Sequence, residues 1–316
     1  TLAKEFNNMK WGPDLILATD MLDLTTFLSL TREKSHNIPT AIYFHENQLS
    51  YPWSPEDRDI QKNRDIHYRF INYASALAAD RVFFNSEFHM NSFLDALHPF
   101  LKHFPDHNEL DSVNIIRNKS SVLHLGMDLK RFDSYKVQKE GKPLILWNHR
   151  WEYDKNPELF FSVLKKVKND GYNFVLAALG ENFSQSPIVF EQAKNIFKDE
   201  IVQWGYTGSF HEYAEWLWKA DILPVTSHQE FFGASVMEAI YCNTWPILPA
   251  RLTYPELIPK NSQKEHLYVD KSDLYEKIIW AIQNYKKIRK TNLSAITFQF
   301  DWKAMVPIYD KVMNSI

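Results

Sequence analysis

The sequence predicts an α/β protein with two domains, each built on parallel strands. Short apolar strands alternate with helical patterns along the chain, which is the order of a parallel sheet covered by helices. The 316 residues exceed what a single core usually holds, so two domains are the default. Near the middle, a polar stretch ends in Lys139-Glu-Gly-Lys-Pro143, which is typical of a connection between domains.

The first half of the chain supplies the strands and helices of an N-terminal domain, which we place at residues 1–127. Runs of apolar residues short enough for strands are separated by longer amphipathic patterns. Strands are expected at 14–18, 40–44, 81–85 and 121–125, and helices at 65–79 and 87–98.

The second half repeats the alternation after a linker that we place at residues 128–142. Strands are expected at 144–147, 174–179, 201–206, 222–226, 246–249 and 267–269, with helices between them that include 157–169 and 272–287. These elements define a C-terminal domain at residues 143–301. The remaining residues, 302–316, carry an amphipathic helical pattern.

Composition restricts the class of protein. The hydrophobic fraction of 45% and charged fraction of 24% are ordinary for a globular enzyme, and no apolar run approaches the ~20 residues that cross a bilayer. There is no signal-peptide pattern, and the single cysteine, Cys242, fits a reducing compartment, so we expect a cytoplasmic protein without membrane insertion. A net charge of −3 means that any nucleic-acid contact would need a local basic face. The candidates for that face are Lys62, Arg64, Arg69, Lys102, Arg117 and Lys119. Each of them could equally be an ordinary solvated charge on the surface.

The segment 227–239 places two carboxylates eight positions apart around a glycine turn. Glu230 precedes Gly233 and Glu238 follows it, between an apolar strand and a helical pattern. The unpaired N–H groups at the start of that helix, which belong to Phe232, Gly233, Ala234 and Ser235, suit a diphosphate. At ~1.5 Å per residue, Glu238 lies about 7–8 Å beyond them, where its carboxylate can accept from two ribose hydroxyls. Isolated glutamates are mostly solvated, but the strand, glycine and helix favour a binding site.

A second loop carries a pair of cations. Arg150 and Lys155 follow the strand at 144–147 and precede the helix at 157–169. A planar guanidinium and a compact ammonium can hold the negative charge that builds up on a departing nucleoside diphosphate. A basic pair alone is usually a solvated turn, so this prediction depends on the carboxylate loop.

At these residues the chain resembles the family-four retaining glycosyltransferases of GT-B fold, whose E-x7-E motif is matched by Glu230 and Glu238. The resemblance implies two Rossmann-like domains facing across a cleft, with the helix at 302–316 completing the N-terminal domain. It implies that Arg150 and Lys155 grip the diphosphate and that Glu230 holds the sugar. The same resemblance places the nucleotide sugar against a set of neighbouring residues: Gly180, Glu181, Tyr206, Phe231, Phe232, Gly233, Ala234 and Glu238.

The segment Tyr43-Phe-His-Glu-Asn-Gln-Leu-Ser-Tyr-Pro52 resembles the signature of the tRNA-queuosine mannosyltransferase group. Further segments that resemble the same group occur at 83–88, 104–107, 147–157 and 230–233, so the resemblance covers nearly the whole chain. It implies transfer of mannose from GDP-mannose to queuosine in tRNA. Members of that group begin with a strand and a glycine-containing loop before the point that matches residue 1, so we expect this N-terminal domain to lack its first β-loop-α unit.

The same segment supplies the expected acceptor side of the site. The resemblance places His45 beside the donor sugar, as a catalytic residue with Arg150, Lys155 and Glu230. The acceptor is expected to meet Glu46, Asn47, Gln48, Tyr51 and Asn85, and tRNA bases could stack on Tyr43, Tyr51 and Trp53.

The expected reaction needs no cofactor and no metal. The twelve histidines include no H-E-x-x-H pattern, and Pro105 separates His103 from His107. A retaining transfer can pass the acceptor proton to the leaving phosphate oxygen. A glycosidase would also use two carboxylates but would not need a diphosphate site. Two alternatives stay open: a glycosyltransferase acting on a lipid or polysaccharide, and a GT-B module that binds nucleotide without turnover. Protein partners are unknown from the sequence.

Overall fold

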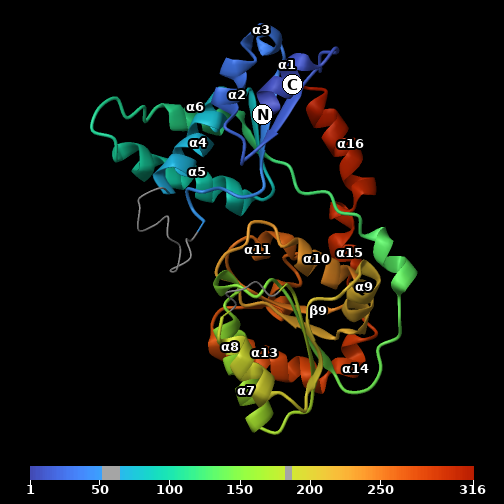
Figure 1. The fold of residues 1–316 in the computed structure, drawn as a ribbon. Helices are drawn as coiled ribbons and strands as arrows, with labels where there is room; N and C mark the ends of the chain where they lie inside the picture. The colour runs from blue at the N-terminus through green and yellow to red at the C-terminus, as the bar shows by residue number, and fades with distance from the viewer. Residues whose placement is uncertain (52–64, 182–186) are drawn as a thin grey trace. The chain divides into compact units, whose positions relative to one another are not determined.

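The chain forms two compact units, and the computed structural model describes residues 1–51, 65–181 and 187–316 (Figure 1). The first unit consists of Thr1–Leu125 and Val306–Ile316, and the second of Gly126–Met305. Helix α16 (Trp302–Met313) therefore runs through the division. Among the described residues, no helix is both long and apolar enough to cross a bilayer.

The first unit contains a parallel sheet with strand order β1-β2-β3-β4. The strands are β1 (Ile16–Thr19), β2 (Thr40–Phe44), β3 (Arg81–Phe84) and β4 (Ser120–Val122). All five residues of β2 are buried, as expected of a parallel strand covered on both faces. The helices are α1 (Leu2–Asn8), α2 (Leu24–Leu30), α3 (Arg32–Ser35), α4 (Asp65–Ala78), α5 (Glu87–Lys102) and α6 (Ser112–Lys119).

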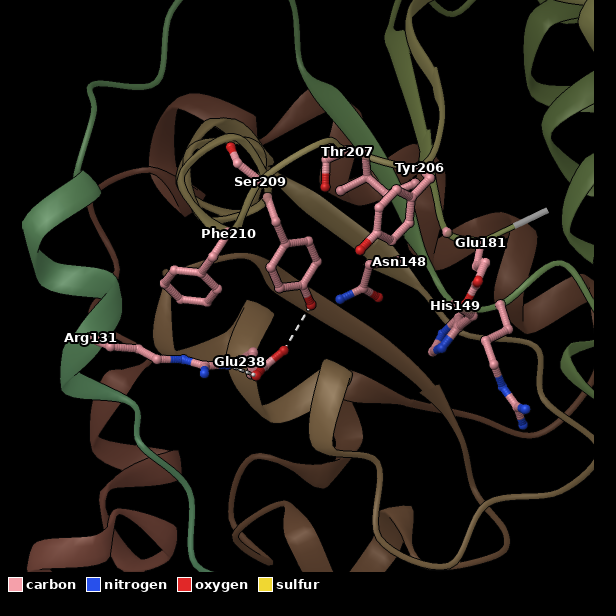
Figure 2. A pocket seen from close by; sticks show the side chains of 13 residues that line it. Arg131, Asn148, His149, Glu181, Tyr206, Thr207, Ser209, Phe210 and Glu238 are labelled. Atoms are coloured by element: carbon pink, nitrogen blue, oxygen red, sulfur yellow. Dashed lines mark hydrogen bonds and ion pairs between the residues drawn. The ribbon is translucent and has the colours of Figure 1, made fainter. Parts of the chain in front are cut away.

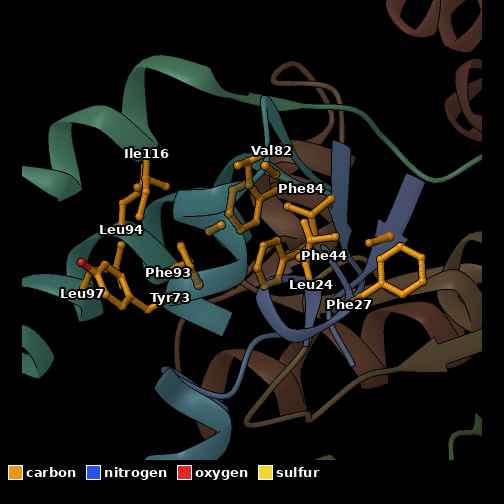
Figure 3. Packing of buried hydrophobic residues seen from close by; sticks show 14 of the residues in the cluster. Leu24, Phe27, Phe44, Tyr73, Val82, Phe84, Phe93, Leu94, Leu97 and Ile116 are labelled. Carbon is orange, nitrogen blue, oxygen red and sulfur yellow. The ribbon is translucent and has the colours of Figure 1, made fainter. Parts of the chain in front are cut away.

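Aromatic side chains from two strands and one helix form the centre of this unit's core (Figure 3). The ring of Phe44 stacks on that of Phe84 at 5.1 Å, and Phe93 of α5 packs against both. Helix α5 is longer than we predicted: it continues through Pro99 to Lys102, because Leu97 and Leu101 are both buried in the same core.

The second unit contains a parallel sheet with strand order β10-β9-β8-β5-β6-β7. The strands are β5 (Leu144–Asn148), β6 (Val175–Leu179), β7 (Ile201–Gly205), β8 (Ile222–Pro224), β9 (Trp245–Pro249) and β10 (Leu267–Tyr268). The chain starts at β5 in the middle, builds outward through β6 and β7, and then returns to place β8 on the other side of β5. Ligands of such sheets bind outside the carboxyl ends of the strands at that point of reversal.

Helices cover both faces of this second sheet (Figure 1). They are α7 (Pro157–Asn169), α8 (Val189–Ile196), α9 (Phe210–Lys219), α10 (Ala234–Tyr241), α11 (Tyr254–Leu257), α12 (Gln263–His266), α13 (Lys271–Gln283), α14 (Tyr285–Ile288) and α15 (Ser294–Thr297). Short 3-10 helices lie in the connections, at η2 (Lys130–Tyr135), η3 (Tyr153–Lys155) and η4 (Phe298–Phe300). Cys242 is fully buried.

The residues that we expected to form a linker, 128–142, lie in the second unit and are partly packed. Phe132 of η2 is fully buried, and the Trp218 indole donates to its carbonyl oxygen at 2.8 Å. Trp302, the first residue of α16, also packs in this unit, against Gly126. From Val306 onward α16 belongs to the first unit, where the Tyr309 hydroxyl donates to the carbonyl oxygen of His124 at 3.0 Å.

Candidate active site

The loops after β5 and β8 form the candidate site of the second unit, because these two strands flank the point of reversal. The β5 loop runs through η3 to Asn156, which has a left-handed backbone conformation. The Asn156 side-chain oxygen caps helix α7 by accepting a hydrogen bond from the Leu159 N–H group. The β8 loop ends at Gly233, which caps α10 with φ of 86° and ψ of 48°. The Asn148 amide ties the two loops together by donating to the Ser235 carbonyl oxygen at 2.7 Å.

A pocket of about 450 Å³ opens beside these loops (Figure 2). Five of the residues that we expected to bind a nucleotide sugar line it, together with eight others that we had not assigned. The expected residues are Arg150, Gly180, Glu181, Tyr206 and Glu238, and the others are Arg131, Asn148, His149, Leu179, Thr207, Ser209, Phe210 and Tyr213.

Glu238 is the most constrained carboxylate of this pocket. It accepts from the Tyr213 hydroxyl at 2.7 Å and from Nη2 of Arg131 at 3.1 Å (Figure 2). Burial raises the pKa of Glu238 above its usual value, although the contacts with Tyr213 and Arg131 act in the opposite direction. The Arg131 guanidinium also stacks on the Phe210 ring at 4.2 Å. The carboxylate therefore has a fixed orientation, and its remaining lone pairs are suited to sugar hydroxyls.

Sequence reasoning missed Arg131 and Tyr213 for different reasons. Arg131 lies in the segment that we interpreted as a linker, 107 residues before the carboxylate that it contacts. Tyr213 lies on α9 among other aromatic and acidic residues, so no local signal distinguishes it. Only the packing of α9 and η2 against α10 brings the three side chains together.

Lys155 lies in a buried ionic cluster outside the pocket lining. Its Nζ atom is 3.1 Å from Asp154, 3.4 Å from Glu230 and 3.2 Å from the Gln229 carbonyl oxygen. Burial lowers the pKa of Lys155, but the Glu230 and Asp154 carboxylates outweigh burial and the net pKa is raised. The ammonium is therefore charged. The cation that we assigned to the diphosphate and the carboxylate that we assigned to the sugar contact each other here.

The amide that we expected Phe232 to offer to a diphosphate is shared with Glu230. The Glu230 carboxylate accepts from the N–H groups of Phe231 and Phe232, at 3.2 and 3.4 Å. Both phenylalanine side chains are 3% exposed, and the Phe232 ring packs edge-on against Phe300. These side chains therefore stabilise the loop by packing in the interior. The N–H groups of Gly233 and Ala234 at the first turn of α10 have no acceptor within that helix, as at every helix start.

Arg150 and Gly180 shape the open side of the pocket. The Arg150 side chain is 48% exposed and lies 3.3 Å from the Glu152 carboxylate. Gly180 has φ of 129°, and a Cβ atom there would lie 2.1 Å from the His149 carbonyl oxygen, so the β5 and β6 loops approach closely. The Trp151 N–H donates to the Glu181 carbonyl oxygen at 3.2 Å, which joins the same loops. The Tyr206 side chain, which also lines the pocket, is 71% exposed.

In the first unit, the expected acceptor-side residues gather at the carboxyl end of β2. His45 is half-exposed, and its backbone N–H donates to the buried Asp20 carboxylate at 2.9 Å, which also lies 3.5 Å from the ring Nδ1. Asn85 donates to the His45 carbonyl oxygen at 3.0 Å and contacts His89 at 2.8 Å. Sequence reasoning missed Asp20, although its position directly after β1 at the same sheet edge is a usable signal.

Several side chains that we expected on the acceptor side are buried or hydrogen-bonded within the protein. The Asn47 oxygen accepts from the N–H groups of Leu49 and Ser50, and the residue is fully buried. Tyr43 is 4% exposed and its hydroxyl donates to the Leu123 carbonyl oxygen, so our expectation that it stacks on a base is wrong. Glu46 is exposed, and Gln48 and Tyr51 are half-buried. Trp53, Lys62 and Arg64 lie outside the described residues.

No group of three or more metal-ligating side chains occurs in the described parts of the chain. The independence of the reaction from metals stays a prediction.

Comparison with known proteins adds independent findings. Residues 1–127 match the family model described as tRNA-queuosine alpha-mannosyltransferase N-terminal, and residues 130–296 match the one described as Glycosyl transferases group 1. A tRNA-queuosine alpha-mannosyltransferase of Drosophila melanogaster is 33% identical over 313 residues, which cover 95% of this chain and 80% of that protein.

Two solved structures share the fold of the whole chain. Anabaena HepE in complex with UDP is 15% identical, with a TM-score of 0.70 over 100% of this chain and 81% of that one. The sucrose-phosphate synthase of Thermosynechococcus elongatus is 16% identical, with a TM-score of 0.68 over 97% of this chain and 75% of that one. The α/β fold of GT-B type that we predicted is therefore confirmed.

The fold and the two matching models define a group 1 glycosyltransferase. The chain belongs, within that class, to the family of the tRNA-queuosine alpha-mannosyltransferases.

Proposed function

We propose that this glycosyltransferase moves mannose from GDP-mannose to queuosine in tRNA, with retention of configuration at the sugar. The observation that carries the proposal is the 33% identity, over 95% of the chain, with a protein of that name. The pocket supports a nucleotide donor, because a constrained carboxylate, Glu238, and an exposed guanidinium, Arg150, line it together.

In the proposed donor complex, Glu238 accepts from the ribose hydroxyls while Glu181 and Tyr206 border the base. Arg150 and the N–H groups of Gly233 and Ala234 meet the diphosphate, where the first turn of α10 favours negative charge. Glu230 orients the mannose. Lys155, which lies 3.4 Å from the Glu230 carboxylate, adds positive charge near the leaving group.

The proposed reaction breaks the bond between the sugar C1 and the diphosphate oxygen and forms a bond from C1 to the acceptor oxygen on the same face. The acceptor proton passes to the departing phosphate oxygen, so the protein supplies electrostatic stabilisation and orientation. His45, held by Asp20, contacts the sugar, and Glu46, Gln48 and Tyr51 contact the acceptor. Asn47 and Asn85 maintain that loop. We place the reaction in the cytoplasm, and expect transfer to continue in EDTA because cations and N–H groups hold the diphosphate.

The division of roles between the two glutamates can be measured. Glu238→Ala is expected to weaken guanosine and GDP equally, by about 1.5–3 kcal/mol, because hydrogen bonds to a charged group are lost. Glu230→Gln is expected to leave GDP affinity nearly intact and to lower kcat for transfer. Titration calorimetry and a transfer assay test both. Equal loss of GDP affinity in the two variants would show that the roles are assigned wrongly.

The acceptor is tested by incubating labelled GDP-mannose with tRNA that contains or lacks queuosine. Label is expected only in the queuosine-containing tRNA. Label in both tRNAs, or in neither while a lipid or polysaccharide acceptor is labelled, would contradict the tRNA acceptor. Binding of GDP without any transfer would indicate a nucleotide-binding module.

A further inference from the structure

His149 is a buried side chain of the pocket that no described residue fully satisfies. It follows β5 directly, is 4% exposed and is one of the residues that line the pocket (Figure 2). Its Nδ1 atom lies 3.4 Å from the Ser235 hydroxyl, whereas Nε2 has no hydrogen-bond partner in the described parts of the chain. A buried ring nitrogen without a partner costs free energy, which a ligand in this pocket would recover.

The imidazole is neutral. Burial lowers the pKa of His149 to about 3, and the nearby Lys155 ammonium acts in the same direction. A neutral imidazole has one donor nitrogen and one acceptor nitrogen. When the Ser235 hydroxyl donates to Nδ1, the proton must be on Nε2, which is then a buried N–H donor without a partner in the described residues.

The surroundings of this N–H group favour an anion. Ser235 lies in the first turn of α10, whose free N–H groups and dipole are positive, and Asn148 fixes that turn to β5 through the Ser235 carbonyl oxygen. Arg150, the next residue, lines the same pocket, and Lys155, although it is paired with Asp154 and Glu230, is close enough to affect the ring. A sugar hydroxyl could also accept from Nε2, but it would not gain from these positive groups.

We propose that His149 binds an oxygen of the donor's diphosphate through Nε2–H, and that the Ser235 hydroxyl fixes the required tautomer. This inference rests on the proposed function only in taking the ligand to be a nucleoside diphosphate. Because the ring is neutral, it adds a directed donor where a further cation beside Arg150 and Lys155 would be repelled.

The test compares two substitutions of similar size. His149→Phe removes the donor, and His149→Gln retains a side-chain N–H group. The probe is whichever of GDP, UDP and ADP binds the wild-type protein most tightly, measured against its own nucleoside. We expect His149→Phe to weaken the diphosphate about 10-fold to 100-fold, the range for losing a hydrogen bond to a charged group, and to leave the nucleoside unchanged. His149→Gln should recover most of the loss, and Ser235→Ala should show a smaller one.

A second measurement does not depend on mutation. The ¹⁵N shifts of His149 should indicate an Nε2–H tautomer that does not titrate near neutral pH, and the diphosphate but not the nucleoside should shift them. Unchanged diphosphate affinity in His149→Phe, equal losses for diphosphate and nucleoside, or an Nδ1–H tautomer would each overturn the inference. Tight binding of UDP or ADP instead of GDP would contradict the GDP-mannose donor while leaving the role of His149 measurable.

Discussion

At the scale of single residues, the ion pairs of this protein differ according to their burial. Lys155 has a side chain that is 10% exposed and faces the carboxylates of Asp154 and Glu230, which are 1% and 19% exposed. Lys219 pairs with Glu215 at 2.8 Å on the surface of α9. Removing one partner of a buried pair leaves an uncompensated charge, whereas water replaces the partner of an exposed one.

We expect Lys155→Met to destabilise the protein by about 3–5 kcal/mol, because Asp154 and Glu230 lose the cation between them. The control, Lys219→Met, should cost no more than about 0.5 kcal/mol. Denaturant unfolding followed by circular dichroism measures both. Similar small losses in the two variants would mean that the Lys155 cluster contributes little to stability.

Two buried histidines make the stability of the folded protein depend on pH. Burial lowers the pKa of His149 to about 3, and burial together with the His45 charge lowers that of His89 to about 3, from 6.5 in each case. The unfolded chain therefore binds more protons between these values. The stabilisation from the neutral rings is complete above pH 6.5 and is lost as the pH falls toward 3.

The melting temperature of the wild-type protein should therefore fall between pH 7 and about pH 4.5 more steeply than that of His149→Phe, since a phenylalanine takes up no proton. His36→Phe, at an exposed position, serves as the control. Parallel pH profiles for wild type and His149→Phe would contradict the assignment of a neutral, buried ring.

At the scale of secondary-structure elements, the connections after the strands depend on glycines. Gly180, Gly205 and Gly233 all follow or end a strand of the second sheet and have positive φ angles. Gly180 also lies against the backbone of the β5 loop, whereas a Cβ atom at Gly205 would meet nothing within 4 Å. A substitution at Gly205 therefore introduces backbone strain alone, whereas a substitution at Gly180 adds a steric clash.

Gly205→Ala is expected to cost about 1–3 kcal/mol from backbone strain alone. Gly180→Ala should exceed it, because the new methyl group would also displace the His149 carbonyl oxygen and distort the pocket. Thermal unfolding gives the two costs, and GDP titration is expected to show weaker binding only for Gly180→Ala. Gly12→Ala, with no nearby atom and no unusual φ, is the control.

At the scale of the whole molecule, a net charge of −3 must be reconciled with the tRNA acceptor that we propose. Nucleic-acid binding would then depend on local basic side chains. Among the described candidates, Lys102 and Arg117 are exposed. Lys119 donates to the carbonyl oxygens of Leu77 and Ala79, so we expect it to contribute less to nucleic-acid binding.

We expect tRNA affinity to fall with rising salt by about 0.7 log units per log unit of salt for each single-strand phosphate contact, while the affinity for GDP changes little. Lys102→Ala and Arg117→Ala should each reduce that slope by about one contact. Lys119→Ala is the comparison variant. Fluorescence anisotropy with labelled tRNA at several salt concentrations measures the slopes. A slope near zero would exclude phosphate-dominated binding.

The sequence by itself determined the features that lie within one short segment. The alternation of strands and helices gives the parallel α/β class because the periodicity of burial is local. The spacing of Glu230, Gly233 and Glu238 sets a carboxylate, a turn and a helix start in order because helical rise is fixed. Arg150, Gly180 and Tyr206 were assigned from the resemblance to glycosyltransferases, and all three line the pocket.

Only the tertiary structure decided which side chains contact one another across the chain. The partners of Glu238 are 107 and 25 residues away in sequence, and Ser235 is 86 residues from His149. Lys155 and Glu230, which we had assigned to different parts of the ligand, pair with each other across 75 residues. Burial likewise decides that Tyr43 and Asn47 stabilise their loop and that His149 is neutral. These properties depend on the packing of distant segments and on the exclusion of water, neither of which a local pattern specifies.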